Sequence, residues 1–460
     1  MYYLYNLALW LATPLLLPWV AYRAARKGLP GLRQRLGIFS SEAWVPEEPV
    51  VWIHAVSVGE VRAAAALIGE LKHRIPEARI VITSSTVQGW NAARALLAPN
   101  ELVLFPPADF IFVCRRFLRR VQPNAVVVLE TELWPNLFRE TRRYGAILLV
   151  VNGRISEKTF PRYWASRLLW RRVLKQPDRF FVQSAADDRR FTALGAAPEK
   201  VCVSRNLKFD SRPAPSPLVE SWREIVTRPE LEVGPVIVAG SIMPGEERYV
   251  LEAFLQLLPE FPRLWMILAP RRSDGFAAVA ERARALGIPI QLRSQWTPQT
   301  NLVFPGVMIL DSMGELGAIY ELATIAYVGG TLVPTGGHNI LEPAFFARPI
   351  VIGPSMSNFQ EIAEEFLQDA GLGRIPIKDG IRIGSIIQIP SDTALAPVWR
   401  FLLHNPSFRR RLGEAAHERW RNKGNSVVPV IDELERLLAL TFAGLTPSIQ
   451  QETAGAARVE

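Results

Sequence analysis

The chain has 460 residues, 49% of them hydrophobic, and a formal net charge of +9 at pH 7. This length favours two domains with sizeable cores, and the basic balance suits an anionic partner such as nucleic acid, a membrane surface or a phosphorylated substrate. Neither of its two cysteines, Cys114 and Cys202, has a second Cys or His at zinc spacing. A disulfide framework is therefore excluded, a metal site through sulfur is disfavoured, and the cysteine content fits the cytoplasm.

The N-terminal segment resembles a membrane anchor. Residues 2–22 hold no charged residue and are about as long as the ~20 residues that span a bilayer. Three basic residues follow at once: Arg23, Arg26 and Lys27. This charge predicts that residues 1–22 form a single-pass anchor with its carboxyl side in the cytoplasm, and that the basic segment 23–35 contacts anionic lipids. Pro14 and Pro18 would kink such a helix, so a re-entrant or interfacial segment is the alternative.

The stretch from Val50 to Arg62 is typical of a buried strand, a tight turn and the start of a helix. Open α/β sheets bind ligands at such junctions, beyond the carboxyl ends of their strands. Ser57 and Glu60 fit a capping box, in which each side chain satisfies a backbone N–H group at the helix start. Glu60 also fits a general base, and Ser57 fits the nucleophile of a turn close to G-x-S-x-G. These residues alone leave the three alternatives open.

Residues 50–210 alternate short apolar strands with helical stretches, which is typical of parallel βα units. The predicted strands are 50–53, 80–83, 102–105, 125–129, 147–151 and 179–182. Two acids, Glu130 and Glu132, follow the fourth strand. Because carboxyl ends of parallel strands meet at one edge of a sheet, these acids are expected to face the same crevice as Glu60. A purely structural role for Glu130 is the alternative.

A proline-rich segment, residues 213–234, is predicted to link the two domains. A second α/β pattern follows it, with predicted strands at 236–239, 265–268, 308–310, 325–328 and 349–352. The glycine-rich loop that starts at Gly329 is expected to offer free backbone N–H groups to a phosphate, whose charge Arg271 or Arg272 would neutralise. Residues 407–440 are predicted to be helical. The polar residues 446–460 are expected to form a disordered tail.

Several common signatures are missing from the sequence. There is no P-loop, no G-x-G-x-x-G fingerprint, no H-E-x-x-H motif and no Asp-x-Asp pair. What is present is a set of acidic residues in one domain and, in the other, a glycine-rich loop and arginines suited to a phosphate. This combination favours transfer from an activated nucleotide donor to an acceptor hydroxyl, with a carboxylate base and no metal.

Five motifs now become informative together, because they occur in a fixed order and spacing. They are His54 to Glu60, Glu130 to Asn136, Asn206 to Asp210, Gly329 to Thr331, and Gly336 to Pro343. With them the chain closely resembles the 3-deoxy-D-manno-octulosonic acid (Kdo) transferases of lipid A biosynthesis, up to about Leu440. The resemblance implies a GT-B glycosyltransferase of the α/β class. Two Rossmann-like domains would face each other across a cleft, residues 23–212 binding the acceptor and residues 235–445 binding the nucleotide sugar, behind an N-terminal membrane anchor helix.

The resemblance also implies the reaction. Kdo would pass from CMP-Kdo to a tetraacyl lipid A precursor, lipid IVA, with inversion of the anomeric centre and without a metal or other cofactor. By similarity Glu60 is the proton acceptor, and Glu130 and Lys208 stabilise the transition state. The implied CMP contacts are Pro270, Arg271, Met313, Gly314, Glu315, Asn339, Ile340, Leu341 and Glu342. The implied location is the cytoplasmic side of the cell inner membrane, with anionic lipids as partners and no nucleic acid.

The chain departs from the family pattern at a few positions. Met243 stands where the family has a polar residue, Arg272 replaces a histidine, and Gln34 replaces a glutamate. A related GT-B enzyme with a different sugar or acceptor is therefore an alternative. So are a serine hydrolase, in which His338 would activate Ser57, and a membrane-tethered nucleotide-sugar binder without catalysis. The presence of both acids, Glu60 and Glu130, favours the transferase.

Overall fold

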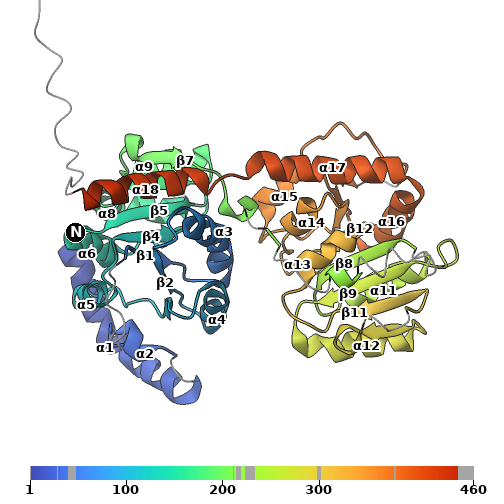
Figure 1. The fold of residues 1–460 in the computed structure, drawn as a ribbon, viewed down its shortest axis with the longest axis horizontal. Coiled ribbons are helices and arrows are strands. Elements are labelled where there is room, and N and C mark those ends of the chain that lie inside the picture. The colour runs from blue at the N-terminus through green and yellow to red at the C-terminus, as the bar shows by residue number, and fades with distance from the viewer. Residues whose placement is uncertain are drawn as a thin grey trace, which may run out of the picture. The chain divides into compact units, whose positions relative to one another are not determined.

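The computed structural model describes residues 2–27, 30–39, 48–210, 212–213, 219–222, 234–297, 302–377 and 380–443. The chain divides into two compact units (Figure 1). Unit 1 consists of Met1–Ser211 and Lys423–Glu460, and unit 2 consists of Arg212–Asn422. Most of the predicted linker and the whole predicted tail, 446–460, lie outside the described residues.

Unit 1 is built on a parallel seven-stranded sheet with the order β3-β2-β1-β4-β5-β6-β7. Its strands are β1 (Val50–His54), β2 (Arg79–Thr83), β3 (Leu102–Leu104), β4 (Ala125–Leu129), β5 (Ile147–Gly153), β6 (Arg179–Val182) and β7 (Val201–Val203). The six predicted strands are confirmed to within two residues. The sequences of these strands are continuous apolar runs, because helices cover both faces of the sheet. The short edge strand β7 was not predicted, since its Cys202 and Val203 side chains are exposed.

Helices cover both faces of this sheet. They are α3 (Val58–Arg74), α4 (Val87–Leu96), α5 (Ile111–Val121), α6 (Pro135–Tyr144), α7 (Phe160–Ala165), α8 (Arg167–Val173), α9 (Ala185–Leu194) and α18 (Val428–Phe442), with short 3-10 turns η1 (Pro198–Lys200) and η2 (Leu207–Asp210). One face packs against α3, α4 and α18, and the other against α5, α6, α8 and α9. Alternate β1 side chains serve the two cores: Ile53 lies in the first and Trp52 in the second.

The last helix belongs to unit 1, although it follows unit 2 in the sequence (Figure 1). The predicted helical section 407–440 is divided into α17 (Pro406–Lys423) and α18. Asp210 explains the division, because its carboxylate accepts hydrogen bonds from the backbone N–H groups of Asn425, Ser426 and Val427 just before α18. The predicted second domain, 235–445, is therefore too long at its C-terminal end.

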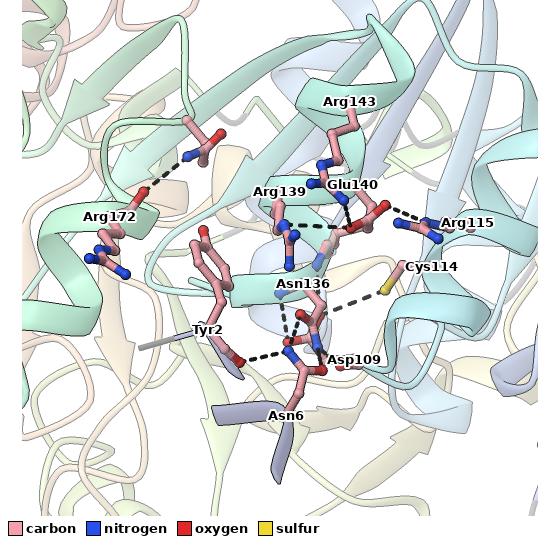
Figure 2. A network of polar contacts seen from close by, with 12 residues as sticks. Tyr2, Asn6, Asp109, Cys114, Arg115, Asn136, Arg139, Glu140, Arg143 and Arg172 are labelled. Atoms are coloured by element: carbon pink, nitrogen blue, oxygen red, sulfur yellow. Dashed lines mark hydrogen bonds and ion pairs between the residues drawn. The ribbon is translucent and has the colours of Figure 1, made fainter. Parts of the chain in front are cut away.

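The N-terminal helix α1 (Tyr2–Lys27) is attached to unit 1 by polar side chains (Figure 2). The Tyr5 hydroxyl donates to the Asp109 carboxylate at 2.8 Å, and the Asn6 and Asn136 side-chain amides exchange two hydrogen bonds at 3.0 and 2.8 Å. Asp109 also accepts from the N–H groups of Asn136 and Leu137 at the start of α6. These contacts join α1 to both α6 and the loop before α5. A short helix, α2 (Leu32–Arg35), follows.

The prediction of a single-pass anchor over residues 1–22 is not supported. Within the ranges that the structure describes, no helix is both long enough and apolar enough to cross a membrane. The absence of charge in this segment was misleading, because uncharged is not the same as apolar. Four Tyr, two Trp and one Asn occur in α1, and each carries a polar group.

Unit 2 is built on an eight-stranded sheet with the order β10-β11-β9-β8-β12-β13-β15-β14, parallel except for the β14–β15 pair. Its strands are β8 (Val236–Ile242), β9 (Trp265–Pro270), β10 (Ile290–Leu292), β11 (Gly306–Ile309), β12 (Ile325–Val328), β13 (Ile350–Ile352), β14 (Arg382–Ile383) and β15 (Ile387–Gln388). The five predicted strands are confirmed, β12 to the residue and the other four with shifted ends. The missed strands β10, β14 and β15 lie toward the edges of the sheet and have only two or three residues.

The helices of unit 2 are α11 (Glu247–Leu255), α12 (Phe276–Ala285), α13 (Leu316–Ile319), α14 (Leu341–Phe345), α15 (Gln360–Phe366), α16 (Leu395–His404) and α17. Short 3-10 turns complete them: η4 (Ser273–Gly275), η5 (Arg293–Gln295), η6 (Tyr320–Leu322) and η7 (Asp392–Ala394). One large core joins alternate side chains of β8, β9 and β12 to α11, α12 and α16. In both units the strand-to-helix connections leave the carboxyl edge of the sheet, where α/β proteins bind ligands.

Candidate functional site

Glu60 is held at the start of α3 by local hydrogen bonds. Ser57 is the N-cap residue, and its hydroxyl accepts from the Glu60 N–H at 3.2 Å. The same hydroxyl donates to Glu60 Oε1 at 2.8 Å, while the Val56 N–H donates to Oε2 at 2.8 Å. The predicted cap is confirmed with one change, because the carboxylate binds the N–H group one residue before the N-cap. The same hydrogen bonds thus cap helix α3 and fix the position of the Glu60 carboxylate.

The pKa of Glu60 is raised well above its ordinary value of 4.5. Burial raises the pKa of this carboxyl group to about 7, because only 6% of the residue is exposed. The hydrogen bond from Ser57 acts in the opposite direction, and the charges of Glu130 and Glu132 raise the pKa further. This coupling shows that the structure brings the three predicted acids together. A carboxylate with this pKa can exchange a proton near neutral pH.

Glu130 stands directly after β4 in a strained backbone conformation. Its φ is +54°, in the left-handed region that residues with a side chain seldom adopt. The Glu130 N–H continues the sheet by bonding the Val151 carbonyl at 3.0 Å, and the Thr131 hydroxyl bonds the Arg154 carbonyl. These bonds hold the strained turn in place. Strain of this kind is commonly stored where function depends on the direction of a side chain.

Aromatic side chains support Glu132. The Trp134 indole N–H donates to Glu132 Oε2 at 2.8 Å, and its ring packs edge-on against the His54 ring, with centroids 4.7 Å apart. His54 is fully buried, its Nδ1 lies 2.9 Å from Thr83 Oγ1, and burial lowers its pKa to about 3. His54 is therefore a neutral support and not a base. Its place at the start of the first motif indicated no role, and its role in packing is visible only in the structure.

The nucleophile-elbow alternative finds no support within unit 1. Both hydrogen bonds of the Ser57 hydroxyl go to Glu60, and the nearest histidine in sequence, His54, is bonded to Thr83. A serine nucleophile requires a base that accepts its proton. Here the only such acceptor of Ser57 in the described ranges is the Glu60 carboxylate, which also forms part of the cap.

Lys208 lies in η2, which packs against α3. The turn is fixed from several sides: the Leu207 N–H donates to Asn152 Oδ1 at 3.0 Å, and the Lys208 N–H donates to Asn206 Oδ1 at 3.0 Å. Asn152, the residue before the last of β5, has a φ of +59° and is a second strained residue at this edge. The motif Asn206 to Asp210 thus places Lys208 beside the helix that carries Glu60, while its Asp210 caps the approach to α18.

In unit 2 a buried carboxylate organises the glycine-rich loop. Glu246 is fully buried, and its Oε1 accepts from the Tyr327 hydroxyl at 2.7 Å and from the N–H groups of Thr331 and Leu332. Its Oε2 accepts from the N–H groups of Met243 and Gly330. The expectation that this loop offers free N–H groups to a phosphate is therefore wrong for these positions. The Glu246 carboxylate already accepts the hydrogen bonds that these N–H groups would otherwise donate to a phosphate.

The other predicted donor-site residues gather at one edge of the unit 2 sheet. They lie at the ends of three strands: Pro270 ends β9 and Arg271 follows it, Met313 to Glu315 follow β11, and Asn339 to Glu342 follow β12 and lead into α14. Asn339 Nδ2 donates to Glu342 Oε1 at 3.2 Å, whereas Glu315 pairs with Arg293 at 3.0 Å. Met313 is 62% exposed and remains accessible to a ligand.

Two arginines follow β9, and they differ in environment. The Arg271 N–H bonds the Ile242 carbonyl at 2.9 Å, so the backbone continues the sheet at this point. The Arg272 side chain instead forms an exposed pair with Asp274 at 2.6 Å. Of the two arginines proposed to neutralise a phosphate, Arg272 thus already pairs with a carboxylate.

Comparison with known proteins agrees with this architecture. The sequence model of the family described as 3-deoxy-D-manno-octulosonic-acid transferase (kdotransferase) matches residues 30–211. The transferase of that name from Haemophilus influenzae is 29% identical over 443 residues, which are 95% of this chain and 98% of that protein. The one from Bordetella pertussis is 30% identical over 451 residues, covering 94% and 98% of the two chains.

A solved glycosyltransferase structure from Rickettsia africae ESF-5 has a TM-score of 0.51 and 13% identity, and covers 85% of this chain and 99% of that chain. At this identity the likeness shows the fold alone, a two-domain glycosyltransferase architecture with parallel sheets. The likeness of sequence extends over almost the whole chain and includes the unit that carries the three clustered acids. The chain therefore belongs to the 3-deoxy-D-manno-octulosonic-acid transferase family and is a glycosyltransferase that transfers Kdo in lipopolysaccharide core biosynthesis.

Proposed function

We propose that the chain transfers Kdo from CMP-Kdo to lipid IVA, with inversion of the anomeric centre and with neither a metal nor another cofactor. The observation that carries this proposal is the Glu60 carboxylate, held by two hydrogen bonds and with a pKa of about 7. A general base is most effective when its pKa lies near the operating pH. Glu60 is thus suited to take a proton from an acceptor hydroxyl in neutral cytoplasm.

The proposed step is a single displacement. The acceptor hydroxyl gives its proton to Glu60, and its oxygen forms a bond with the anomeric carbon of Kdo. The bond between that carbon and the phosphate oxygen of CMP breaks at the same time, so that CMP leaves as an anion. Attack from the side opposite the leaving group inverts the centre.

Glu130 and Lys208 are proposed to stabilise the charges that develop during this step. Glu130 is a carboxylate in a fixed, strained turn, and its negative charge suits a sugar ring that becomes cationic as the bond to CMP breaks. Lys208 brings a positive charge to the same unit, in a turn packed on α3. Its ammonium group suits the carboxylate of Kdo or the departing phosphate.

On the donor side, Arg271 is proposed to bind the phosphate of CMP, and Glu342 to accept hydrogen bonds from the ribose hydroxyls. The other proposed CMP contacts are Pro270, Met313, Gly314, Glu315, Asn339, Ile340 and Leu341. Their common position at the carboxyl edge of the unit 2 sheet supports this proposal. A related sugar or acceptor is the second candidate. It is favoured by Met243, which has no polar side chain and whose N–H donates to the buried Glu246 carboxylate.

The lipid acceptor is proposed to be reached at the surface of the inner membrane, on the cytoplasmic side. Helix α1 turns Tyr5 and Asn6 toward unit 1 and leaves Tyr3, Leu4, Leu7, Trp10 and Leu11 exposed. Phe112 of α5 is also exposed and stacks on Trp10 at 6.2 Å. An apolar face with tryptophan suits a helix that lies in the interface and does not cross the bilayer. The anionic lipids expected to contact the basic segment 23–35 belong to the same proposal.

One assay tests the donor, the acceptor and the base together. Purified protein is incubated with CMP-Kdo and lipid IVA in detergent, with a chelator present, and the lipid product is identified by mass spectrometry. The expected product is lipid IVA with added Kdo, and the Glu60→Gln variant is expected to form it about 10²–10⁴-fold more slowly. Absence of product with the wild type, or undiminished product with the variant, would contradict the proposal. The anomeric configuration of the product, read by NMR, tests inversion.

A further inference from the structure

Unit 2 contains a cavity of about 460 Å³ far from the carboxyl edge of its sheet. Its lining residues are Leu322, Ala323, Thr324, Ala347, Arg348, Pro349, Pro406, Ser407, Arg409 and Arg410. Thr324 directly precedes β12 and Pro349 directly precedes β13, so the cavity lies at the amino ends of these strands. The proposed donor residues follow the opposite ends of β9, β11 and β12. The cavity is therefore separate from the proposed donor site.

The polar part of the lining is basic. Three arginines line the cavity, Arg348, Arg409 and Arg410, and no acidic residue in the described part of the chain is among its lining residues. The 18-residue helix α17 begins at Pro406, and its first turn supplies Ser407 to the wall. The amino end of a helix carries partial positive charge, which adds to that of the arginines. This combination selects an anion and disfavours a metal ion.

Arg348 is the central group of this cluster. Its Nε is buried and has no hydrogen-bond partner in the described part of the chain, whereas nearly all buried polar groups in proteins have one. Burial lowers the pKa of Arg348, and the charge of Glu321 only partly opposes that shift. An anion in the cavity would supply both the missing acceptor and a compensating charge.

The backbone around Arg348 is built to hold it there. Ala347 has a φ of +54°, a strained conformation for a residue with a side chain. Helix α17 approaches it closely at Gly413, where an added Cβ would lie 2.1 Å from the Ala347 carbonyl oxygen. Arg409 is also fixed, because its Nη1 donates to the carbonyl of Leu402 at 3.1 Å. Two of the three arginines are thus positioned before any ligand arrives.

We propose that this cavity is a second ligand site that binds a phosphate group carried on a small organic molecule. The arginines and the start of α17 would hold the phosphate. Leu322, Ala347, Pro349 and Pro406 offer an apolar wall to the organic part. The volume suits a ligand of metabolite size, since such sites span roughly 300–1,000 Å³. A soluble phosphate ester and a phospholipid headgroup share the required chemistry.

The test measures binding of glycerol phosphate to the full chain in detergent by calorimetry, with CMP at saturation to fill the donor site. Arg348→Gln is expected to weaken this binding about tenfold or more, because it removes a charge-assisted contact. Arg348→Lys, which keeps the charge, should recover part of it. The matched control is Arg419→Gln, which changes a half-buried arginine of α17 that bonds Gln368 and does not line the cavity. It should leave binding unchanged.

Two outcomes would overturn the proposal. One is that neither glycerol phosphate nor vesicles containing phosphatidic acid bind in the presence of CMP. The other is binding that Arg348→Gln and Arg419→Gln affect equally, with both variants folded by circular dichroism. Binding of glycerol phosphate that depends on Arg348 supports a soluble ligand. Arg348-dependent binding of phosphatidic acid vesicles alone, compared with phosphatidylcholine vesicles, supports a lipid headgroup.

Discussion

The hydroxyl of Ser57 donates a hydrogen bond to the carboxylate of Glu60 at 2.8 Å, and accepts one in return from the Glu60 backbone N–H. One pair of residues therefore both starts helix α3 and sets the position of the proposed base. The two roles can be separated by substitution, because they depend on different atoms of the pair.

Replacing Glu60 by Gln should remove the base and keep the cap. A Gln side chain is accepted at this helix position, and its amide oxygen can still accept from Ser57 or Val56. It cannot accept the hydroxyl proton, so the turnover number should fall about 10²–10⁴-fold. Steady-state kinetics with CMP-Kdo and lipid IVA measure this, and thermal unfolding serves as the control for folding. Near-normal turnover would move the search for the base to Glu130 or Glu132.

Replacing Ser57 by Ala should do the reverse. Loss of an N-cap side chain costs about 1 kcal/mol of stability, while the base itself is kept. The hydrogen bond from Ser57 lowers the pKa of Glu60, so its removal should raise that pKa and shift the acidic limb of the activity profile to higher pH. The profile of kcat against pH measures the shift. Complete loss of activity at every pH would instead favour a nucleophilic Ser57.

The raised pKa of Glu60 also predicts how stability depends on pH. Between its ordinary value of 4.5 and its folded value of about 7, the folded chain retains a proton that the unfolded chain has lost. The protonated Glu60 therefore contributes its whole share to the free energy of unfolding below pH 4.5. This contribution, up to about 3 kcal/mol, is lost as the pH rises through about 7. Urea unfolding should show that Glu60→Gln gains stability over the wild type across this range. A difference that is constant with pH would refute the shift.

Arg271 and Arg272 form a matched pair for testing the donor site. Arg271→Ala should weaken CMP binding by roughly 1.5–3 kcal/mol, the usual contribution of a hydrogen bond to a charged group. Arg272→Ala should have little effect, because its side chain already pairs with Asp274 in solvent. Calorimetric titration with CMP compares the two. Equal losses would mean that net charge, and not a specific contact, governs binding.

Replacing Glu246, which accepts hydrogen bonds from the glycine-rich loop, should lower both the stability of the chain and its affinity for the donor. Glu246→Gln replaces one of two acceptor oxygens by an amide that must face the N–H groups of Met243 and Gly330. Buried donors left without a partner cost about 1–3 kcal/mol each. Urea unfolding and CMP titration should both show the change. Glu247→Gln is the control, since Glu247 accepts from the Gly245 N–H and pairs loosely with Arg282. A similar effect there would argue against a special role for Glu246.

The sequence predicted those parts of the fold that depend on local pattern. The bounds of β4 and β6 were predicted to the residue, because an apolar run between polar residues marks a strand buried on both faces. The cap at Ser57 was predictable for the same reason, since its partner is three residues away. The clustering of Glu60 with Glu130 and Glu132 followed from parallel topology alone.

The predictions that failed concern residues whose partners are distant in the sequence. The Glu246 carboxylate binds groups 81 to 86 residues away, so the loop at Gly329 looked free when its N–H groups were already taken. Asp210 and the start of α18 are separated by more than 200 residues, and no local pattern connects them. The anchor prediction failed differently, because a count of charges ignores the hydrogen bonds of Tyr5 and Asn6. The roles of the proposed catalytic and CMP-binding residues stay predictions.

The return of α18 to unit 1 affects the order in which the chain can mature during synthesis. Unit 2 is one uninterrupted segment, and all of its residues have been made before α18 emerges from the ribosome. Unit 1 must wait, because Val430, Ile431, Leu434 and Leu438 of α18 complete one of its two cores. Domains commonly finish folding in the order of the sequence. In this enzyme the nascent unit that carries Glu60 stays incomplete, with part of its core uncovered, until almost the whole polypeptide has been translated.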